Sequence, residues 1–221
     1  MKHIAHIRTD FGTKFGIPRQ SGIVNKLVGK IVMEPEYRVR EAFRGLEEFS
    51  HLWLIWHFSE IKKEEWSPTV RPPKLGGNKR VGVFATRSPF RPNSMGLSSV
   101  KLKKIDYEAV DGPVLWVEGA DLMDHTPIFD IKPYLPFTDC HPEAKGGFTD
   151  EVLRTEEKLK IMNPEAIDGR LPKDKAEALV EVLKNDPRPQ YHEDKDRIYG
   201  IDFCGKDIRF RVEGDQLTII V

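Results

Sequence analysis

The chain has 221 residues, which is enough for one large domain, or for a domain and a small appendage, around a buried hydrophobic core. Its longest apolar run, Leu52–Trp56, is far too short to span a bilayer and excludes a protein built from transmembrane helices. Its 35 basic and 35 acidic side chains cancel, which argues against a protein that coats nucleic acid over its whole surface.

The N-terminus and the cysteines indicate a cytoplasmic protein. Residues 1–12 contain no apolar segment followed by a cleavage site, so we expect no secretory signal. Cys140 and Cys204 are the only cysteines, and neither has a CxxC partner or a metal-ligand spacing. We therefore expect a reducing compartment, no metal and no membrane.

The first 140 residues carry short apolar segments separated by turns rich in Pro and Gly. One short helix is predicted over 40–50, where Ala42, Phe43, Leu46 and Phe49 recur at helical spacing. Several closely spaced strands with little helix are typical of a β-barrel or sandwich. The strands are predicted over 3–8, 29–33, 51–58, 80–85, 98–105 and 114–120.

The pattern changes after about residue 147. Helices are predicted over 151–161 and 172–185, and strict alternation then predicts a three-stranded antiparallel meander over 198–203, 207–212 and 216–221. We expect a mainly β protein with a smaller α+β part. An N-terminal barrel would cover 1–147 and a C-terminal α+β domain 148–221, with the boundary at Gly146-Gly147.

Polar residues gather in four stretches, 14–24, 71–80, 86–100 and 119–137. In the first, Pro18 stiffens the chain ahead of Arg19 and Gln20. In the last, three Asp residues offer carboxylates for ribose hydroxyls, for an ammonium group or for base catalysis. Each stretch alone is typical of a turn, but four in one small barrel favour a ligand site.

Cations are concentrated between Glu65 and Asp106, where the chain has nine basic residues and no acidic one. Such a field suits a phosphate-bearing partner or another anionic ligand. Motifs for other chemistries are missing, because the sequence has no GxGxxG opening a helix, no Walker loop, no HExxH and no nucleophile elbow.

Four blocks of the sequence resemble the signatures of the TsaA/TrmO family, whose members are S-adenosylmethionine-dependent tRNA adenine-N6 methyltransferases. They read "KFGIPRQSG" (14–22), "RGLEEFSHLWLIWHF" (44–58), "RPPKLGGNKRVGVFATRSPFRPNSMGLS" (71–98) and "GADLMDHTPIFDIKPYLPF" (119–137). The stretch "DPRPQYH" (186–192) and the terminal strands are similar to the C-terminal domain of longer bacterial members.

This resemblance implies a β-barrel that binds the methyl donor without a Rossmann sheet and forms a homodimer with the donor near the subunit interface. It also implies a substrate, threonylcarbamoyl-adenosine beside the anticodon of threonine tRNAs. Carried over by motif, the donor site consists of Pro18, Arg19, Gln20, Ser59, Glu60, Arg87, Leu97, Asp121, Leu122, Met123 and Asp124.

Three positions depart from the family pattern. His125 stands where a "DGTP" turn has glycine, and a positive φ there would cost about 1 kcal/mol. "IRTDF" replaces a more usual "IRSPF/Y", and Ser59-Glu60 replaces His-Gln.

Methyl transfer from a sulfonium is an in-line displacement, so alignment of the reacting atoms dominates. Asp124 and Asp130 are our candidates for a base that removes the N6 proton, although water is an alternative. Tyr134 is a candidate for stacking on the adenosine. The residues expected to meet tRNA phosphates are Lys74, Lys79, Arg80 and Arg91.

Two other functions compete with this hypothesis. One is a non-catalytic barrel that binds S-adenosylmethionine or RNA, which the appearance of methylated nucleoside in tRNA would exclude. The other is a metal-dependent hydrolase built on the Asp residues of 119–137, which lacks histidines at ligand spacing.

Overall fold

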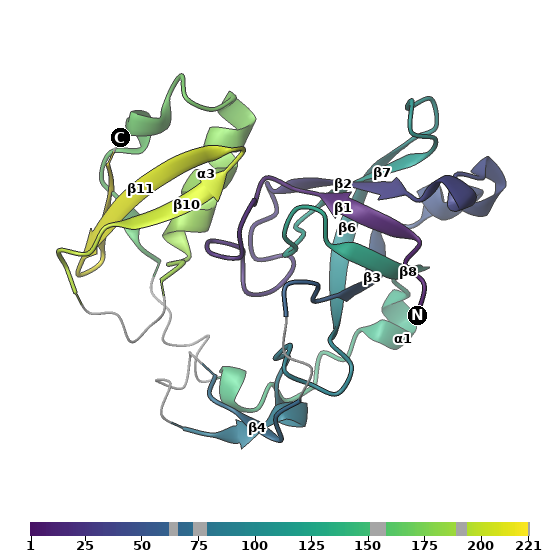
Figure 1. The fold of residues 1–221 in the computed structure, drawn as a ribbon, viewed down its shortest axis with the longest axis horizontal. Coiled ribbons are helices and arrows are strands. Elements are labelled where there is room, and N and C mark those ends of the chain that lie inside the picture. Colours follow the sequence, from purple (N-terminus) through teal and green to yellow (C-terminus); the bar gives the residue numbers. More distant parts are fainter. Residues whose placement is uncertain (62–65, 73–78, 151–157, 189–193, 221) are drawn as a thin grey trace.

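A closed six-stranded antiparallel barrel dominates the computed structural model, which describes residues 1–61, 66–72, 79–150, 158–188 and 194–220. The strands follow each other around the barrel in the order β1-β2-β7-β6-β3-β8 (Figure 1). Their bounds are β1 Ala5–Arg8, β2 Val28–Met33, β3 His51–His57, β6 Met95–Asp106, β7 Val114–Glu118 and β8 Pro127–Pro133.

Successive side chains of each strand point alternately into the barrel and out of it, and this decides which of them fill the interior. In β3, Leu52, Leu54 and Trp56 are buried inside, and the intervening residues lie on the outer face. β6 lies antiparallel to β3, with Trp56 opposite Gly96 and Leu54 opposite Ser98. Ser98 is therefore a buried polar residue on the inner face of the barrel.

A second body contains a four-stranded sheet in the order β10-β11-β12-β9 (Figure 1). The buried side of helix α3 (Lys173–Lys184) shares one hydrophobic core with this sheet. Cys204 and Gly205 form the β10–β11 turn, and both have positive φ, as two-residue hairpin turns require. The strands are β9 Lys160–Ile161, β10 Tyr199–Phe203, β11 Lys206–Glu213 and β12 Gln216–Ile220.

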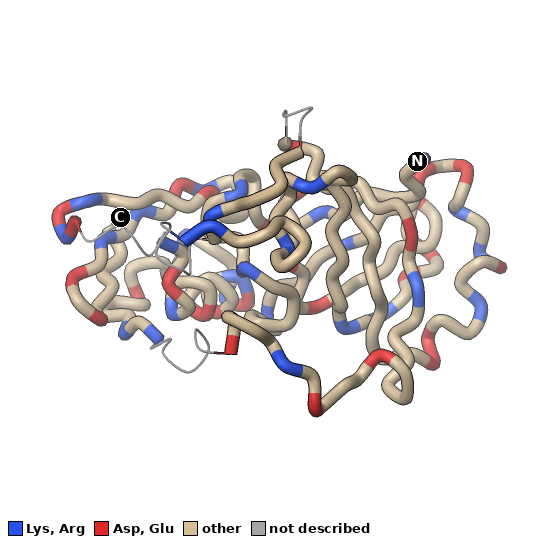
Figure 2. The backbone as a smooth tube through the Cα atoms, turned by 90° about the horizontal axis from the view of Figure 1, so that it is seen from below, with Lys and Arg blue, Asp and Glu red and all other residues tan. Residues whose placement is uncertain are grey.

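A small lobe projects from the barrel, where β4 (Thr69–Val70) pairs with β5 (Val81–Gly82) (Figure 1). The remaining short elements are η1 Pro35–Tyr37, η2 Arg40–Phe43, η3 Leu46–Glu48, η5 Val83–Ala85, α1 Pro136–Asp139 and η6 Pro164–Ile167. Basic and acidic residues are mixed along both bodies (Figure 2), in keeping with the zero net charge. Within the described ranges, no helix has the length and apolarity to cross a membrane.

The expected architecture is confirmed: the fold is mainly β, with a barrel and a C-terminal sheet packed on a helix. The helix predicted over 172–185 is α3. The three-stranded meander is present and gains β9 as a fourth strand, parallel to β12.

Four local predictions were wrong. The helix over 40–50 is two 3₁₀ turns, because Gly45 between them has a φ of 83°. The strand over 80–85 ends at Gly82 and continues as η5. Lys160–Ile161 is a strand and not the end of a helix, and residues 151–157 of that helix lie outside the described residues. In the stretch 119–137, where no strand was predicted beyond residue 120, the structure contains β8.

The connection between β1 and β2 belongs to the core of the second body. Phe11, Val24 and Leu27 are buried there with residues of α3 and the C-terminal sheet. Phe11 also forms a bridge with Phe203, and their rings meet edge to face at 5.2 Å. In Figure 1 this connection reaches from the barrel toward β10 and α3. The two bodies are therefore joined by a shared core.

Replacing Phe11 by Ala tests this shared core. The ring is 1% exposed, so we expect the free energy of unfolding to fall by about 3–5 kcal/mol. Denaturant titration followed by circular dichroism measures the loss. The matched control is Phe137→Ala, because that ring is 87% exposed and its removal changes the value by less than about 0.5 kcal/mol. A loss below about 1 kcal/mol for Phe11→Ala would show that the ring does not join the two bodies.

Candidate functional site

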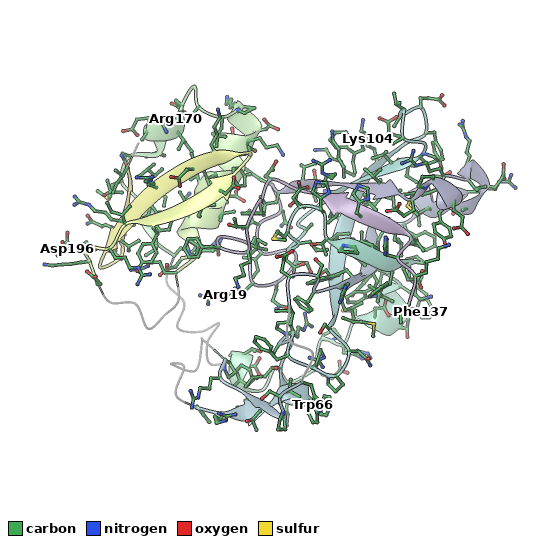
Figure 3. All side chains as sticks on the ribbon, in the orientation of Figure 1. Arg19, Trp66, Lys104, Phe137, Arg170 and Asp196 are labelled. Atoms are coloured by element: carbon green, nitrogen blue, oxygen red, sulfur yellow. The ribbon has the colours of Figure 1, made fainter. Side chains whose placement is uncertain are left out.

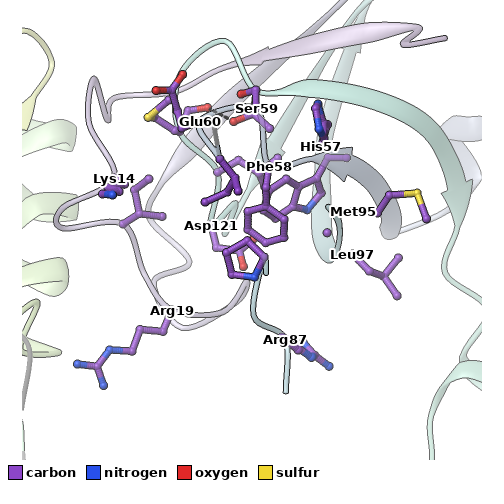
Figure 4. A pocket seen from close by; sticks show the side chains of 18 of the residues that line it. Lys14, Arg19, His57, Phe58, Ser59, Glu60, Arg87, Met95, Leu97 and Asp121 are labelled. Carbon is purple, nitrogen blue, oxygen red and sulfur yellow. Dashed lines mark hydrogen bonds between the residues drawn. The ribbon is translucent and has the colours of Figure 1, made fainter. Parts of the chain in front are cut away.

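One cavity of about 540 Å³ lies where four segments meet. The segments are the loop 14–20, the end of β3 with 58–61, the stretch 86–97 and the turn 121–126. This volume is within the range of small-molecule sites, about 300–1,000 Å³. Figure 4 shows Asp121 and Phe58 near its centre, with Met95 and Leu97 on one side and Lys14 and Arg19 on the other.

The structure brings together almost all of the residues expected at the donor site. Ten of the eleven line this cavity, although they come from segments up to about a hundred positions apart in the sequence. These ten are Pro18, Arg19, Gln20, Ser59, Glu60, Arg87, Leu97, Asp121, Leu122 and Met123.

Hydrogen bonds connect the loop 14–20 with the opposite wall. The Arg87 guanidinium donates to the side-chain oxygen of Gln20. The Gly22 amide donates to the Gly119 carbonyl at 2.9 Å, which joins the end of this loop to the start of the turn carrying Asp121. Arg19 donates to the Arg188 carbonyl of the second body at 3.0 Å. The loop 14–20 is thus held both by the opposite wall of the cavity and by the second body.

Asp121 is a largely buried carboxylate in the cavity. Its Oδ1 accepts a hydrogen bond from Ser98 Oγ at 2.6 Å, and Ser98 Oγ in turn accepts one from Trp56 Nε1 at 3.0 Å. Burial raises the pKa of Asp121, while the Ser98 hydroxyl, backbone amides and the Arg87 charge act in the opposite direction. The carboxylate is fixed in direction and incompletely compensated, which suits a cationic or hydrogen-donating ligand.

An aromatic surface lies beside this carboxylate. The Trp56 and Phe58 rings lie 4.2 Å apart at an angle of 58°. Gly96 lies directly against the indole, where a Cβ atom would be 2.2 Å from Trp56 Cε2, so any larger residue must displace the ring. The cavity therefore combines aromatic rings with a largely buried carboxylate, two features that a ligand with a planar ring and a positive charge would use.

Asp124 and Asp130, the two predicted base candidates, do not line the cavity. Asp124 accepts hydrogen bonds from Arg8 Nε at 3.0 Å and from the Thr9 amide at 2.9 Å, and so joins the turn to β1. Asp130 lies on the outer face of β8, where it pairs with Lys132 at 3.2 Å. Asp124 therefore holds its turn against β1, and Asp130 forms an exposed ion pair within β8.

Tyr134, the predicted stacking residue, also lies away from the cavity. It contacts Trp53 and His51, at the opposite end of β3 from Trp56. His125 has a φ of 62°, so the turn does take the conformation that favours glycine, and its imidazole lies 3.4 Å from Asp124.

The predicted phosphate contacts differ in their surroundings. Lys79 and Arg80 are exposed on the small lobe, and Arg80 donates to Thr69 Oγ1 at 2.6 and 2.8 Å. Arg91 instead lines the cavity and donates to the carbonyls of Thr86 and Ser88 at 3.0 and 3.3 Å. Lys74 lies outside the described residues.

Sequence reasoning missed several lining residues, including Lys14, Trp56, His57, Phe58 and Gly96, and also Ser98 behind the wall. A signal for Ser98 was present: it lies two positions before Val100 in a strand and thus on the inner face. For the residues that the structure describes, no group of three or more His, Cys, Asp or Glu is arranged to hold a metal ion.

Thermal unfolding between about pH 3 and 7 tests the burial of Asp121. Because its pKa is raised on folding, the folded state binds more protons than the unfolded chain between the two pKa values. The free energy of unfolding therefore falls as the pH rises through this window. We expect Asp121→Asn, which keeps an acceptor for Ser98, to melt above the wild type at pH 7 and to lose this advantage at the acid end.

Asp139→Asn is the control of opposite sign. The pKa of Asp139 is lowered by hydrogen bonds from the Leu135 amide and Trp53 Nε1, so its charged form stabilises the fold above the unfolded pKa. This variant should melt below the wild type at pH 7. A lower melting temperature for Asp121→Asn at pH 7 would contradict the dominance of burial at Asp121.

Comparison with known proteins connects this geometry to a family. Residues 6–140 match "tRNA-methyltransferase O N-terminal domain" and residues 156–221 match "TrmO C-terminal domain". An Escherichia coli (strain K12) relative named "tRNA (adenine(37)-N6)-methyltransferase" is 38% identical over 218 residues, covering 96% of this chain and 92% of the relative. A human protein of the same name is 36% identical over 157 residues, covering 68% of this chain and 33% of the human protein.

A further relative and a solved structure agree with this match. The Pseudomonas aeruginosa protein "Putative S-adenosylmethionine-dependent methyltransferase RcsF" is 37% identical over 224 residues, covering 99% of this chain and 94% of that protein. The "Crystal structure of TrmO from Pseudomonas aeruginosa" superposes with a TM-score of 0.76 at 28% identity, covering 99% of this chain and 95% of that one. Since the similarity extends over both bodies, the chain belongs to the tRNA-methyltransferase O (TrmO) family.

Proposed function

We propose that this chain is an S-adenosylmethionine-dependent methyltransferase that acts on N6 of adenosine 37 in tRNA. The substrate nucleoside is threonylcarbamoyl-adenosine of threonine tRNAs. One observation carries the proposal: a cavity with a buried carboxylate and an aromatic surface lies in a fold that matches relatives of that activity over almost its whole length.

The cavity side chains fit this donor. When bound, S-adenosylmethionine supplies a methyl group on a positively charged sulfur. Asp121 offers a fixed negative charge to the cationic part of the molecule, and Arg19 and Arg87 offer donors to its carboxylate. Phe58 and Leu97 offer apolar walls for the adenine. Pro18, Gln20, Ser59, Glu60, Leu122 and Met123 complete the proposed donor site.

Catalysis rests on positioning. The carbonyl attached to the carbamoylated nitrogen makes its N–H more acidic than that of unmodified adenine, so water at the open cavity is sufficient to accept the proton. Asp124 and Asp130 point elsewhere, and we assign Asp124 to holding the turn 121–126 against β1. Residues of this chain thus contribute by holding and orienting the reactants.

Nucleoside analysis by mass spectrometry tests this function. The tRNA is incubated with protein and S-adenosylmethionine, and one added methyl on threonylcarbamoyl-adenosine is expected. Arg87→Ala removes a cavity cation and should weaken donor binding about tenfold or more, as measured by calorimetry. Lys79→Ala, an exposed cation that does not line the cavity, is the matched control and should leave donor binding unchanged. Binding of donor and tRNA without methyl transfer would instead identify a non-catalytic module.

The small lobe is the proposed tRNA surface. Trp66 and Phe84 stack on each other at 6.2 Å and 23°, and they remain 49% and 72% exposed (Figure 3 labels Trp66). Arg80 and Lys79 lie on the same lobe, within the part of the sequence that has no acidic residue. Exposed aromatic rings among cations suit unpaired bases and their phosphates. The chain that follows this lobe contributes Arg87 and Arg91 to the cavity.

Salt dependence of tRNA binding separates the two kinds of contact. Arg80→Gln should lower the slope of log affinity against log salt by about one, because one phosphate contact is lost. Trp66→Ala should weaken binding about tenfold with an unchanged slope, because a stacked base carries no counterion. Phe137→Ala, an exposed ring elsewhere on the barrel (Figure 3), is the control. A Trp66→Ala variant that changed the oligomeric state and not tRNA affinity would identify the lobe as a subunit contact.

We further propose a cytoplasmic homodimer. On the outer face of β3 and β6, Met95 and the half-exposed Leu97 line the edge of the cavity, and an exposed apolar edge of a ligand site suits a subunit contact. The free thiols of Cys140 and Cys204 agree with a reducing compartment.

A further inference from the structure

Residues 10–19 lead from the end of β1 to the donor cavity. Three groups of contacts hold them against the second body, which is the C-terminal body of the molecule. The first centres on Asp10. Its Oδ2 accepts a hydrogen bond from Lys175 Nζ at 2.6 Å, and the two side chains are 13% and 24% exposed. The Cys204 thiol donates to Asp10 Oδ1 at 3.2 Å, and the Cys204 amide donates to the Asp10 carbonyl at 2.8 Å. Asp10 is therefore bound through both its side chain and its backbone.

The second group places the chain directly on strands β10 and β11. The Phe15 ring stacks on Tyr199 and Phe210, at centroid distances of 6.2 and 6.5 Å and an interplanar angle of 11° for both. Gly16 has a φ of 95°, and a Cβ there would lie 2.9 Å from Ile201 Cδ1. The backbone at Gly16 thus lies against the buried Ile201 side chain, in a conformation that favours glycine.

The third contact lies at the cavity itself. The Arg19 guanidinium donates to the Arg188 carbonyl at 3.0 Å, and the Arg188 side chain is held by Asp186 through two bonds of 2.8 Å. Between Phe15 and this contact lie Ile17 and Pro18, which line the cavity. The lining loop is thus fixed on both sides by the C-terminal body. Figure 3 shows Arg19 between the two bodies.

We propose that the C-terminal body positions the donor-binding loop 14–20, with Lys175, Tyr199 and Phe210 as positioning residues that act through Asp10 and Phe15. None of the three lines the donor cavity. The assignment of the loop to the methyl donor rests on the proposed function. The mechanical coupling between the two bodies does not.

The energetics support a specific role for Lys175. An Asp–Lys pair with little exposure is costly to break on one side, because the remaining charge has lost its partner and stays poorly solvated. Without the Lys175 charge, the Asp10 carboxylate is better solvated when it is exposed to water. We expect the chain that carries Asp10, and the loop that follows it, to move away from the C-terminal body for this reason. Loop disorder would weaken donor binding, since the loop must then be ordered on binding. It would leave the reacting atoms unaffected once the donor is bound.

The test compares Lys175→Met with Lys184→Met, a change of the same kind at an exposed lysine on the same helix. In hydrogen–deuterium exchange without donor, amides of residues 11–20 should exchange about tenfold faster in Lys175→Met and at the wild-type rate in Lys184→Met. In steady-state methylation, KM for S-adenosylmethionine should rise about tenfold, while kcat and KM for tRNA stay at wild-type values. Lys175→Arg, which retains the charge, should restore both measurements.

Phe15→Leu provides a second variant in case Lys175→Met does not fold, because it loses the aromatic stack but remains apolar. It should show the same pair of changes. Wild-type exchange of residues 11–20 in the folded variants would overturn the inference, as would a fall in kcat with an unchanged donor KM. If the wild type transfers no methyl group, the proposed function fails, but the exchange result still decides whether the C-terminal body holds the loop.

Discussion

A single stretch of chain, from Asp10 to Leu27, connects two strands of the barrel and yet packs into the core of the C-terminal body. It leaves the barrel at the end of β1 and buries Phe11, Val24 and Leu27 in the C-terminal core before it returns as β2. Close packing leaves this stretch little freedom, since a shift of its buried side chains would open a void in the C-terminal core. This packing also limits the movement of the cavity wall, because residues 14–20 of the same stretch line the cavity.

The opposite wall of the cavity is also held by hydrogen bonds. Trp56, Ser98 and Asp121 form a chain of donors and acceptors from the barrel interior to the cavity. A buried carboxylate is unfavourable for stability on its own, and the pKa of Asp121 is raised for this reason. Retaining such a group in a cavity is typical of a site where a ligand completes the electrostatics.

Much of the architecture was predictable because apolar and polar residues alternate along a strand that has one buried face. Leu52, Leu54 and Trp56 in β3, and Ile208, Phe210 and Val212 in β11, show this pattern clearly. β8 was missed because its prolines and its Asp130 and Lys132 resemble a turn. Two-residue β9 is too short to leave any periodic signal.

The lining of the cavity was predictable where turns contain several polar residues in a family pattern, as at 18–20 and 121–123. The failure at Asp124 has a geometric cause: consecutive residues of a turn point in different directions, and only the backbone decides which one faces the cavity. Phe11 and Phe15 gave no functional signal, because their partners lie almost two hundred positions later.

The reactivities of the two thiols report whether the C-terminal body is packed against the segment that carries Asp10. Cys140 is exposed, whereas burial and the adjacent Asp10 carboxylate raise the pKa of Cys204 to about 12. Only thiolate reacts readily with alkylating reagents, so a docked molecule is labelled at Cys140 and protected at Cys204. The slow rate of Cys204 labelling therefore reports how often the C-terminal sheet separates from the Asp10 segment of the barrel domain.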